Sequence, residues 1–263
     1  FEAEPMARQN DTHCHLTFNP LFKKIDEIID DKNLLMISVG TNIENSKQNI
    51  EIAKKYNNVF ASVGIHPSEI QPTVHPRSAQ NGLEELVKLN NVIAVGEIGL
   101  DEKIENISLY DQEKYLDYWI DIAVKNKLPI IFHARGKKSI NIIIENILKR
   151  INQGQKVRGV FHCFTGNVKQ ARRINKLGLY IGLTNIVCNC NDYDKLVKEI
   201  DINYLLCETD APFIVPKIVT RKYSLPFDVK HVYQKIAEIK NFKLKEVQET
   251  IYQNCQKLFN LEL

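Results

Sequence analysis

The sequence is organised around a short histidine-rich stretch near its start, Asp11-Thr12-His13-Cys14-His15. If this stretch is a β-strand, successive side chains alternate between its two faces, so that His13 and His15 share a face with Asp11. Neutral imidazole is the commonest side-chain ligand of divalent transition metals. Two imidazoles on one face at a strand end therefore suggest part of a metal site, although an isolated His-x-His pair is more often a pair of surface histidines. The remaining ligands must come from elsewhere in the chain.

Length and composition indicate one ordinary globular domain. The 263 residues are 44% hydrophobic and 25% charged, values typical of a protein with a sizeable core. An α/β barrel needs about 250 residues as one unit. We therefore expect a single domain over residues 11–263, with residues 1–10 as a frayed lead-in or a remnant of cloning. The net charge of +3 does not exclude a polyanionic partner, because a local basic patch can bind one.

The cysteines and the apolar segments bear on the cellular compartment. None of the six cysteines forms a Cys-x-x-Cys pair, and most lie in apolar runs. We therefore expect reduced, mainly buried thiols in a cytoplasmic protein, with a nuclear or organellar pool as an open alternative. Cys188-Asn189-Cys190 can be interpreted as a soft-metal site, but packing is favoured because two further cysteines are missing nearby. No apolar run approaches the ~20 residues that span a bilayer, so we expect no membrane partner.

Apolar runs alternate with amphipathic segments along the whole chain. The runs that predict strands lie at residues 11–15, 34–40, 59–64, 92–96, 128–132, 159–161, 179–183 and 204–207. Between them apolar residues recur at helical spacing, as at Ile140, Ile143, Ile144 and Ile147. Eight such strand–helix units predict a parallel sheet closed into a single TIM-type (β/α)8 barrel. A doubly wound open sheet is the structural alternative, but no Gly-x-Gly-x-x-Gly follows the first strand to support a dinucleotide site.

Side chains that suit metal binding follow the predicted strands. In a β/α barrel the carboxyl ends of the strands carry the chemistry. These ends carry His13, His15, His66, Glu97, His133, His162, Glu208 and Asp210. Each residue alone has an ordinary explanation, such as a core histidine or a carboxylate paired with an arginine. Their convergence at one rim instead predicts a site for two divalent metals, with Glu97 placed to bridge them; a single-metal site is the alternative.

The motifs at these strand ends also occur together in one protein family. In chain order they are Asp11-Thr-His-Cys-His15, Gly64-Ile-His-Pro67, Gly96-Glu-Ile-Gly-Leu-Asp101, His133-Ala-Arg135, His162-Cys-Phe-Thr-Gly166 and Glu208-Thr-Asp-Ala-Pro212. Their order and spacing resemble those of the TatD family of metal-dependent deoxyribonucleases over nearly the whole chain. The resemblance implies a TIM-type barrel, two divalent metal ions (Mg, Mn or Zn) and hydrolysis of DNA phosphodiesters, as a 3′ exonuclease or, in some members, an endonuclease.

Carried over residue by residue, the resemblance implies a role for each site residue. One metal would be held by His13, His15, Glu97 and Asp210, and the other by Glu97, His133 and His162. The substrate-binding or supporting groups would be His66, Arg135 and Glu208. Asp210 is also placed to orient or deprotonate the attacking water, which makes Asp210 and Glu97 the expected catalytic residues.

Two other functions stay open from the sequence. A metal-activated water attacks carbonyls as well as phosphoryl groups, so the same ligands suit an amidohydrolase or an aminoacyl-ester hydrolase with a small substrate. Such an enzyme should have a closed apolar pocket, whereas a nuclease should have a broad rim with phosphate donors such as Arg135. A scaffold that binds nucleic acid or protein without catalysis is the other alternative, but it has no need for six converging ligands. We expect a monomer with DNA as its substrate.

Overall fold

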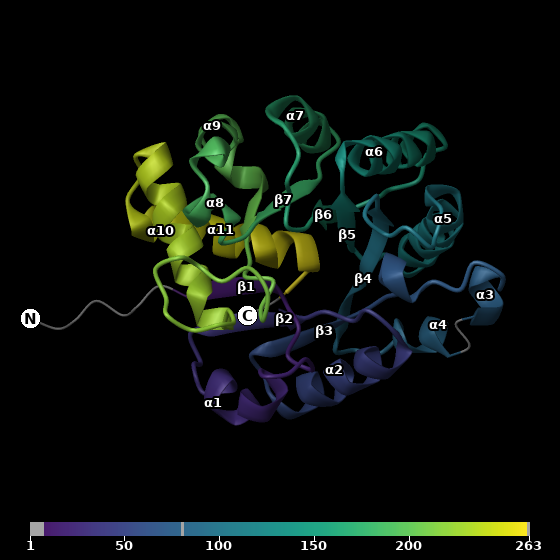
Figure 1. The fold of residues 1–263 in the computed structure, drawn as a ribbon, viewed down its shortest axis with the longest axis horizontal. Helices are drawn as coiled ribbons and strands as arrows, with labels where there is room; N and C mark the ends of the chain where they lie inside the picture. Colours follow the sequence, from purple (N-terminus) through teal and green to yellow (C-terminus); the bar gives the residue numbers. More distant parts are fainter. Residues whose placement is uncertain (1–7, 80–81, 262–263) are drawn as a thin grey trace, which may run out of the picture.

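The apolar runs become one parallel sheet in the computed structural model, which describes residues 8–79 and 82–261. Its strands are β1 (Gln9–Cys14), β2 (Leu34–Ser38), β3 (Val59–Val63), β4 (Val92–Asp101), β5 (Ile130–Arg135), β6 (Gly159–Phe161), β7 (Tyr180–Leu183) and β8 (Leu205–Cys207). They pair in chain order from β1 to β8, and each pair is parallel. The predicted (β/α)8 barrel is confirmed (Figure 1). Of the predicted lead-in, residues 1–7 lie outside the described residues, and Gln9 and Asn10 already belong to β1.

Amphipathic helices surround this sheet (Figure 1). They are α1 (Ile25–Ile29), α2 (Ile43–Lys55), α3 (Pro76–Ala79), α4 (Leu83–Leu86), α5 (Leu109–Asn126), α6 (Lys137–Asn152), α7 (Val168–Lys176), α8 (Ile186–Asn189), α9 (Asp194–Glu199), α10 (Val229–Lys240) and α11 (Leu244–Phe259). Short 3-10 helices lie at Phe22–Lys24, Pro67–Glu69, Asn191–Tyr193, Ile202–Tyr204 and Pro226–Asp228. Side-chain caps begin several helices; the Asn167 side chain, for example, accepts from the Gln170 amide at the start of α7. None of the helices in the described part of the chain has the length and apolar composition needed to span a bilayer.

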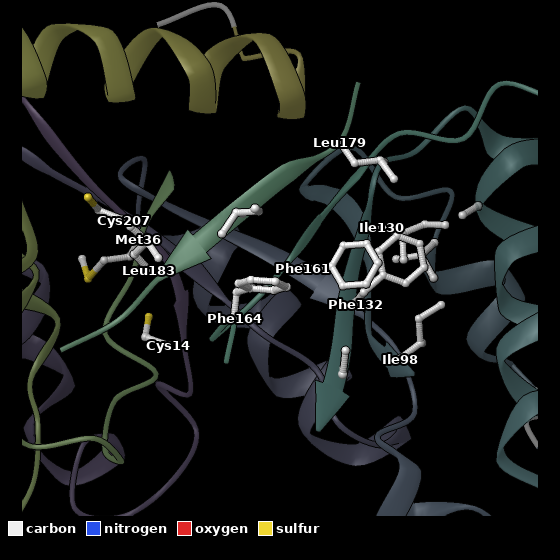
Figure 2. Close-up of a cluster of buried hydrophobic side chains, with 14 of the residues drawn as sticks. Cys14, Met36, Ile98, Ile130, Phe132, Phe161, Phe164, Leu179, Leu183 and Cys207 are labelled. Atoms are coloured by element: carbon white, nitrogen blue, oxygen red, sulfur yellow. The ribbon is translucent and has the colours of Figure 1, made fainter. Parts of the chain in front are cut away.

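The barrel buries two apolar cores because its strands alternate between an outer and an inner face. The outer core lies between strands and helices; Figure 2 shows part of it, with the rings of Phe132 and Phe161 5.2 Å apart. The inner core contains Leu35, Ile37, Val39, Ile93, Ala94, Ile131, Val160, Tyr180, Leu206, Cys255, Leu258 and Phe259. The last three belong to α11, so this helix packs against the barrel interior. Figure 1 shows α11 crossing the sheet, and the inner core supports the site at the carboxyl ends of the strands.

The cysteines match the predicted reduced state but are less buried than expected. All six are free thiols. Cys14, Cys207 and Cys255 are buried, whereas Cys163, Cys188 and Cys190 are half-buried. Within residues 8–79 and 82–261, neither Cys188 nor Cys190 belongs to a group of side chains spaced to hold a metal. Cys188 packs against the outer apolar core.

The structure corrects the predicted end of the fourth strand. β4 continues to Asp101 because Gly99, Leu100 and Asp101 pair with His133, Ala134 and Arg135 of β5. Close pairing at this point requires glycine, since a Cβ on Gly99 would lie 1.9 Å from the His133 carbonyl oxygen. Glu97 and His133 therefore lie within strands rather than after them. The extension also adds a second carboxylate, that of Asp101, to the same strand.

The barrel closes just beyond the short strand β8. The Asp210 amide donates to the His13 carbonyl, and the His15 amide donates to the Ala211 carbonyl, each over 2.8 Å. Cys14 and Ala211 form a parallel bridge at this point. This closure brings Asp210, which is distant in sequence, beside the two histidines that open the chain.

A buried carboxylate reinforces this closure and leads to a prediction about stability. Asp11 accepts hydrogen bonds from the Thr209 amide (2.9 Å) and the Thr209 hydroxyl (2.6 Å). Replacing Asp11 with alanine would leave these buried donors unpaired, so we expect the free energy of unfolding to fall by about 1–3 kcal/mol. Urea unfolding measures this loss. Asp11→Asn keeps one accepting oxygen, so its free energy of unfolding should fall by less. Equal urea midpoints for the wild type, Asp11→Ala and Asp11→Asn would contradict a stabilising role for these hydrogen bonds.

Candidate metal centre

The site residues predicted from the sequence converge at the carboxyl end of the barrel. They surround a cavity of about 660 Å³, and those on its wall are His15, His66, Glu97, His133, Arg135, His162 and Asp210. The two remaining predicted residues, His13 and Glu208, are fully buried behind this wall. All of the predicted site residues converge because the carboxyl ends of parallel strands lie at one edge of the barrel.

Glu97 lies at the middle of this cluster, and its two carboxylate oxygens face different imidazoles. Oε1 lies 2.6 Å from Nδ1 of His133 and 2.7 Å from Nε2 of His162. Oε2 lies 3.5 Å from Nε2 of His13 and 4.0 Å from Nε2 of His15. One oxygen therefore serves each pair of histidines, as a bridging carboxylate requires.

Asp210 completes the set on the side of β1. Its Oδ1 lies 3.6 Å from Nε2 of His13 and 3.3 Å from Nε2 of His15. The two imidazole nitrogens are themselves 3.3 Å apart. His13, His162 and Asp210 form one group whose ligand atoms all lie within 4.8 Å of one another, and His13, His15 and Glu97 form another. Such spacing suits a small cation at the centre of each group.

His66 lies close enough to the cluster to be a metal ligand, but its hydrogen bonds indicate that it is a donor to an anion instead. Its Nε2 lies 3.9 Å from Oε1 of Glu97, and His66, Glu97 and His133 form a third group with metal-binding spacing. The Ser68 amide, however, donates to Nδ1 of His66. The Ser68 hydroxyl lies 2.7 Å from the same nitrogen; with Nδ1 accepting from the amide, we assign the proton of neutral His66 to Nε2. A protonated nitrogen can donate to an anion but cannot bind a metal.

Glu208 does not face the cavity, so of the two roles expected for it, substrate binding or support, its position fits support. Its side chain is 0% exposed and accepts hydrogen bonds from the Cys163 amide and the Thr12 hydroxyl. Its Oε1 lies 3.7 Å from Nδ1 of His162, on the side of that ring away from Glu97. Burial raises the pKa of Glu208 to about 7, against the opposing effect of His162. Glu208 therefore lies behind the His162 ring, where its contact is electrostatic.

Asp101 belongs to the centre although the sequence interpretation gave it no role. Its Oδ2 lies 3.1 Å from Nε2 of His133, so the ring is held between Asp101 and Glu97. A carboxylate behind a histidine fixes the ring orientation and the position of its proton. The sequence feature that predicts this position is the even spacing of Glu97 and Asp101, which places both side chains on one face of a continuous strand.

Arg135 is the cationic group at the rim. It is the last residue of β5, its side chain is 63% exposed, and it lies on the cavity wall. Its guanidinium is 3.9 Å from Oδ2 of Asp101, which leaves most of its donors free for an anion. The neighbouring Lys137 and Lys138 begin α6 and do not line the cavity.

The electrostatics of the cluster favour a bound cation. Burial works to raise the pKa of Glu97, but the charges of His162 and His66 and the hydrogen bonds of His13 and His133 hold it well below its usual range. Burial likewise works to lower the pKa of His162, yet the negative charge of Glu97 raises it to about 9. The negative charge of the centre thus stabilises a buried positive charge by more than burial disfavours it.

The imidazole of His13, by contrast, is neutral and available as a ligand. Burial lowers the pKa of His13 to about 4, and the charge of His162 adds to this effect. For Asp210, burial works to raise the pKa, but His15, by hydrogen bonding, and His13, by charge, hold it below its usual value. Neutral imidazoles and ionised carboxylates are the forms that bind divalent metals. The residues present therefore fit a divalent cation.

A β/α barrel that gathers imidazoles and carboxylates at the carboxyl ends of its strands is the architecture of a metal-dependent hydrolase. The family model described as TatD related DNase matches residues 10–260. The chain therefore belongs to the TatD family and is a hydrolase of that family.

Individual relatives agree with this assignment. A Methanocaldococcus jannaschii protein named an uncharacterized metal-dependent hydrolase is 32% identical over 259 residues, which is 96% of this chain and 97% of the relative. A Salmonella typhimurium protein named 3′-5′ ssDNA/RNA exonuclease TatD is 28% identical over 77% of this chain and 78% of its own. The crystal structure of a TatD homologue from Escherichia coli superposes with a TM-score of 0.85 at 24% identity, covering 98% of this chain and 100% of that one, and supports the fold.

Proposed function

We propose that this hydrolase cleaves phosphodiester bonds of DNA with two divalent metal ions and acts as a 3′ exonuclease. The observation that carries the proposal is the division of the Glu97 carboxylate, which presents Oε2 to His13 and His15 and Oε1 to His133 and His162. A single-metal enzyme has no need for a buried carboxylate with imidazoles at both oxygens.

These contacts support the two ligand sets that the family resemblance implies. One ion would be held by His13, His15, Glu97 and Asp210, and the other by Glu97, His133 and His162. Two divalent ions in such sets, when bound, polarise a phosphoryl oxygen and lower the pKa of a water molecule. Mg, Mn and Zn are the candidates, and the mixture of imidazole and carboxylate donors is compatible with each.

The remaining residues act on the substrate and on the proton. Asp210 is 15% exposed and ionised, so one carboxylate oxygen can serve a metal while the other accepts a proton from water. Arg135 can donate two parallel hydrogen bonds to a phosphate beside the scissile one. His66, through its protonated Nε2, is a second donor for a phosphate oxygen.

The rim favours a phosphodiester over the small substrate of an amidohydrolase. An exposed guanidinium beside the proposed metal ligands matches the negative charge of a nucleic acid backbone, whereas an uncharged amide offers no negative charge to pair with it. The Salmonella relative named as a single-stranded DNA and RNA exonuclease supports the same substrate class. The cytoplasmic location and the monomeric state expected from the sequence stay predictions.

Metal removal and replacement test this function directly. EDTA-treated protein should leave 5′-labelled single- and double-stranded DNA intact, and adding Mg²⁺, Mn²⁺ or Zn²⁺ should restore cleavage. A 3′ exonuclease produces a ladder that shortens one nucleotide at a time, whereas an endonuclease produces internal fragments early. Parallel reactions with RNA and with an aminoacyl ester complete the comparison. Hydrolysis of the ester without cleavage of either nucleic acid would contradict the proposal.

A further inference from the structure

Two aromatic side chains form part of the cavity wall beside the metal centre. Phe213, in the loop after β8, is 49% exposed, and Phe18, after β1, is half-buried; both line the cavity. Their ring centroids are 6.2 Å apart with the planes nearly perpendicular. Of the exposed large apolar side chains within residues 8–79 and 82–261, Phe213 alone lines this cavity. Its ring is therefore free to contact a ligand in the cavity.

The position of Phe213 is held by the backbone of the loop that carries Asp210. The Phe213 amide donates to the Asp210 carbonyl over 2.8 Å, which closes a tight turn. The next residue, Ile214, has φ of 45°, a left-handed conformation that β-branched residues rarely adopt. Strained backbone of this kind persists where the surrounding structure enforces it and is concentrated at functional sites. The turn therefore ties the exposed ring to a residue of the metal centre.

The aromatic pair is continuous with the proposed metal ligands. The ring of Phe18 stacks on His15 with 4.8 Å between centroids and 19° between planes. Phe213 meets the same imidazole edge to face at 5.8 Å. Arg135 ends β5, which is on the opposite side of an eight-stranded barrel from β1 and β8. The metal centre thus lies between an aromatic wall and a cationic one.

We propose that Phe213 forms a platform on which the base next to the scissile phosphate stacks, with Phe18 buttressing the Phe213 ring through their near-perpendicular contact, while Arg135 holds the backbone on the other side of the metal centre. This inference rests on the proposed nuclease function and specifies its substrate as an unpaired strand, since the faces of a base within a duplex are covered by its neighbours. Every base has a π face, so the platform predicts cleavage with little sequence preference.

Abasic substrates test the platform with the metal-loaded enzyme. Single-stranded DNA is made with a tetrahydrofuran abasic residue on either side of the scissile phosphate or, as a control, ten nucleotides away. For the wild type, we expect the adjacent abasic residue to lower kcat/KM by about tenfold and the distant one to have no effect. Phe213→Ala should lose about tenfold on the intact strand and no longer distinguish it from the abasic one.

Two further variants separate stacking from apolar packing, and one tests nonspecific effects. Phe213→Trp should keep the wild-type preference for a base, whereas Phe213→Leu, which fills space without a π face, should lose it. Phe242 is equally exposed, at 48%, but lies away from the cavity, so Phe242→Ala should behave as the wild type. Metal content is measured for each protein. If Phe213→Ala loses metal because the Phe213 ring packs beside His15, the base preference of Phe213→Leu provides the test of stacking instead.

The outcomes distinguish this inference from the function on which it rests. If the wild type cleaves DNA but does not discriminate against the adjacent abasic residue, the platform is wrong and the nuclease function stands. If Phe213→Leu keeps the full wild-type preference, the contact is apolar packing rather than stacking, and the inference is again overturned. If the wild type cleaves no nucleic acid with any of the three cations, the proposed function itself fails.

Discussion

Replacing Glu97 with alanine is expected to abolish binding of at least one of the two metal ions and to lower kcat/KM on DNA by at least about 10³-fold. Its two oxygens face separate pairs of imidazoles, so removing the carboxylate takes a ligand from both proposed ions. The loss of metal-based charge stabilisation amounts to several kcal/mol, and each 1.36 kcal/mol is a factor of ten in rate. Elemental analysis of the purified variant measures the bound metal, and end-labelled DNA measures the rate.

A neighbouring carboxylate provides the matched control for Glu97. Glu69 lines the same cavity but is exposed and belongs to none of the three groups with metal-binding spacing found among residues 8–79 and 82–261. Glu69→Ala should therefore keep its metal and most of its activity. Two ions per chain in Glu97→Ala, with Glu69→Ala behaving the same way, would show that Glu97 is not the bridge.

Replacing Asp210 with asparagine is expected to lower turnover by about 10²-fold or more while the protein keeps its metal and still binds DNA. The asparagine has the same shape and retains one coordinating oxygen, but it is a far poorer base than the ionised carboxylate. The expected size is that of the loss of general-base help. Turnover is measured at saturating metal, so that weaker metal binding does not contribute to the difference.

Asp101 separates a defect in metal binding from a defect in proton transfer. Asp101→Asn weakens the contact that orients His133, and supporting residues of this kind typically cost 10- to 100-fold in metal affinity. Its turnover should therefore recover at high metal concentration, whereas that of Asp210→Asn should not. A near wild-type rate for Asp210→Asn at saturating metal would mean that the water needs no carboxylate base, and the role of Asp210 would be wrong.

The barrel could be predicted from the sequence because its signal is local and repeated. Near-continuous apolar runs are typical of strands buried on both faces, and the helical spacing of Ile140, Ile143 and Ile147 predicts a helix packed on one side. Both patterns follow from the geometry of the backbone within a few residues. The residue types of the centre could be predicted for a related reason, since parallel strands end at one edge whatever their loops do.

The direction of each side chain at that edge could not be predicted in the same way. Glu208 and Asp210 are two carboxylates two residues apart, yet one is buried behind His162 and the other faces the cavity. The difference arises because the Asp210 amide pairs with the His13 carbonyl and Asp210 itself has φ of 56°. Such a contact joins residues that are far apart in the sequence and leaves no trace in local periodicity.

The sequence by itself therefore determined the barrel, the residue types of the candidate centre and their order around the rim. Only the tertiary structure decided that β4 extends to Asp101, that Glu97 divides its oxygens between two pairs of histidines, and that Phe213 stands exposed beside them. The physical reason is the separation in sequence between the residues that determine each feature. Strand and helix periodicity depends on neighbouring residues, whereas strand ends, side-chain directions and loop conformations depend on pairing between distant segments and on a few backbone angles after the strands have met.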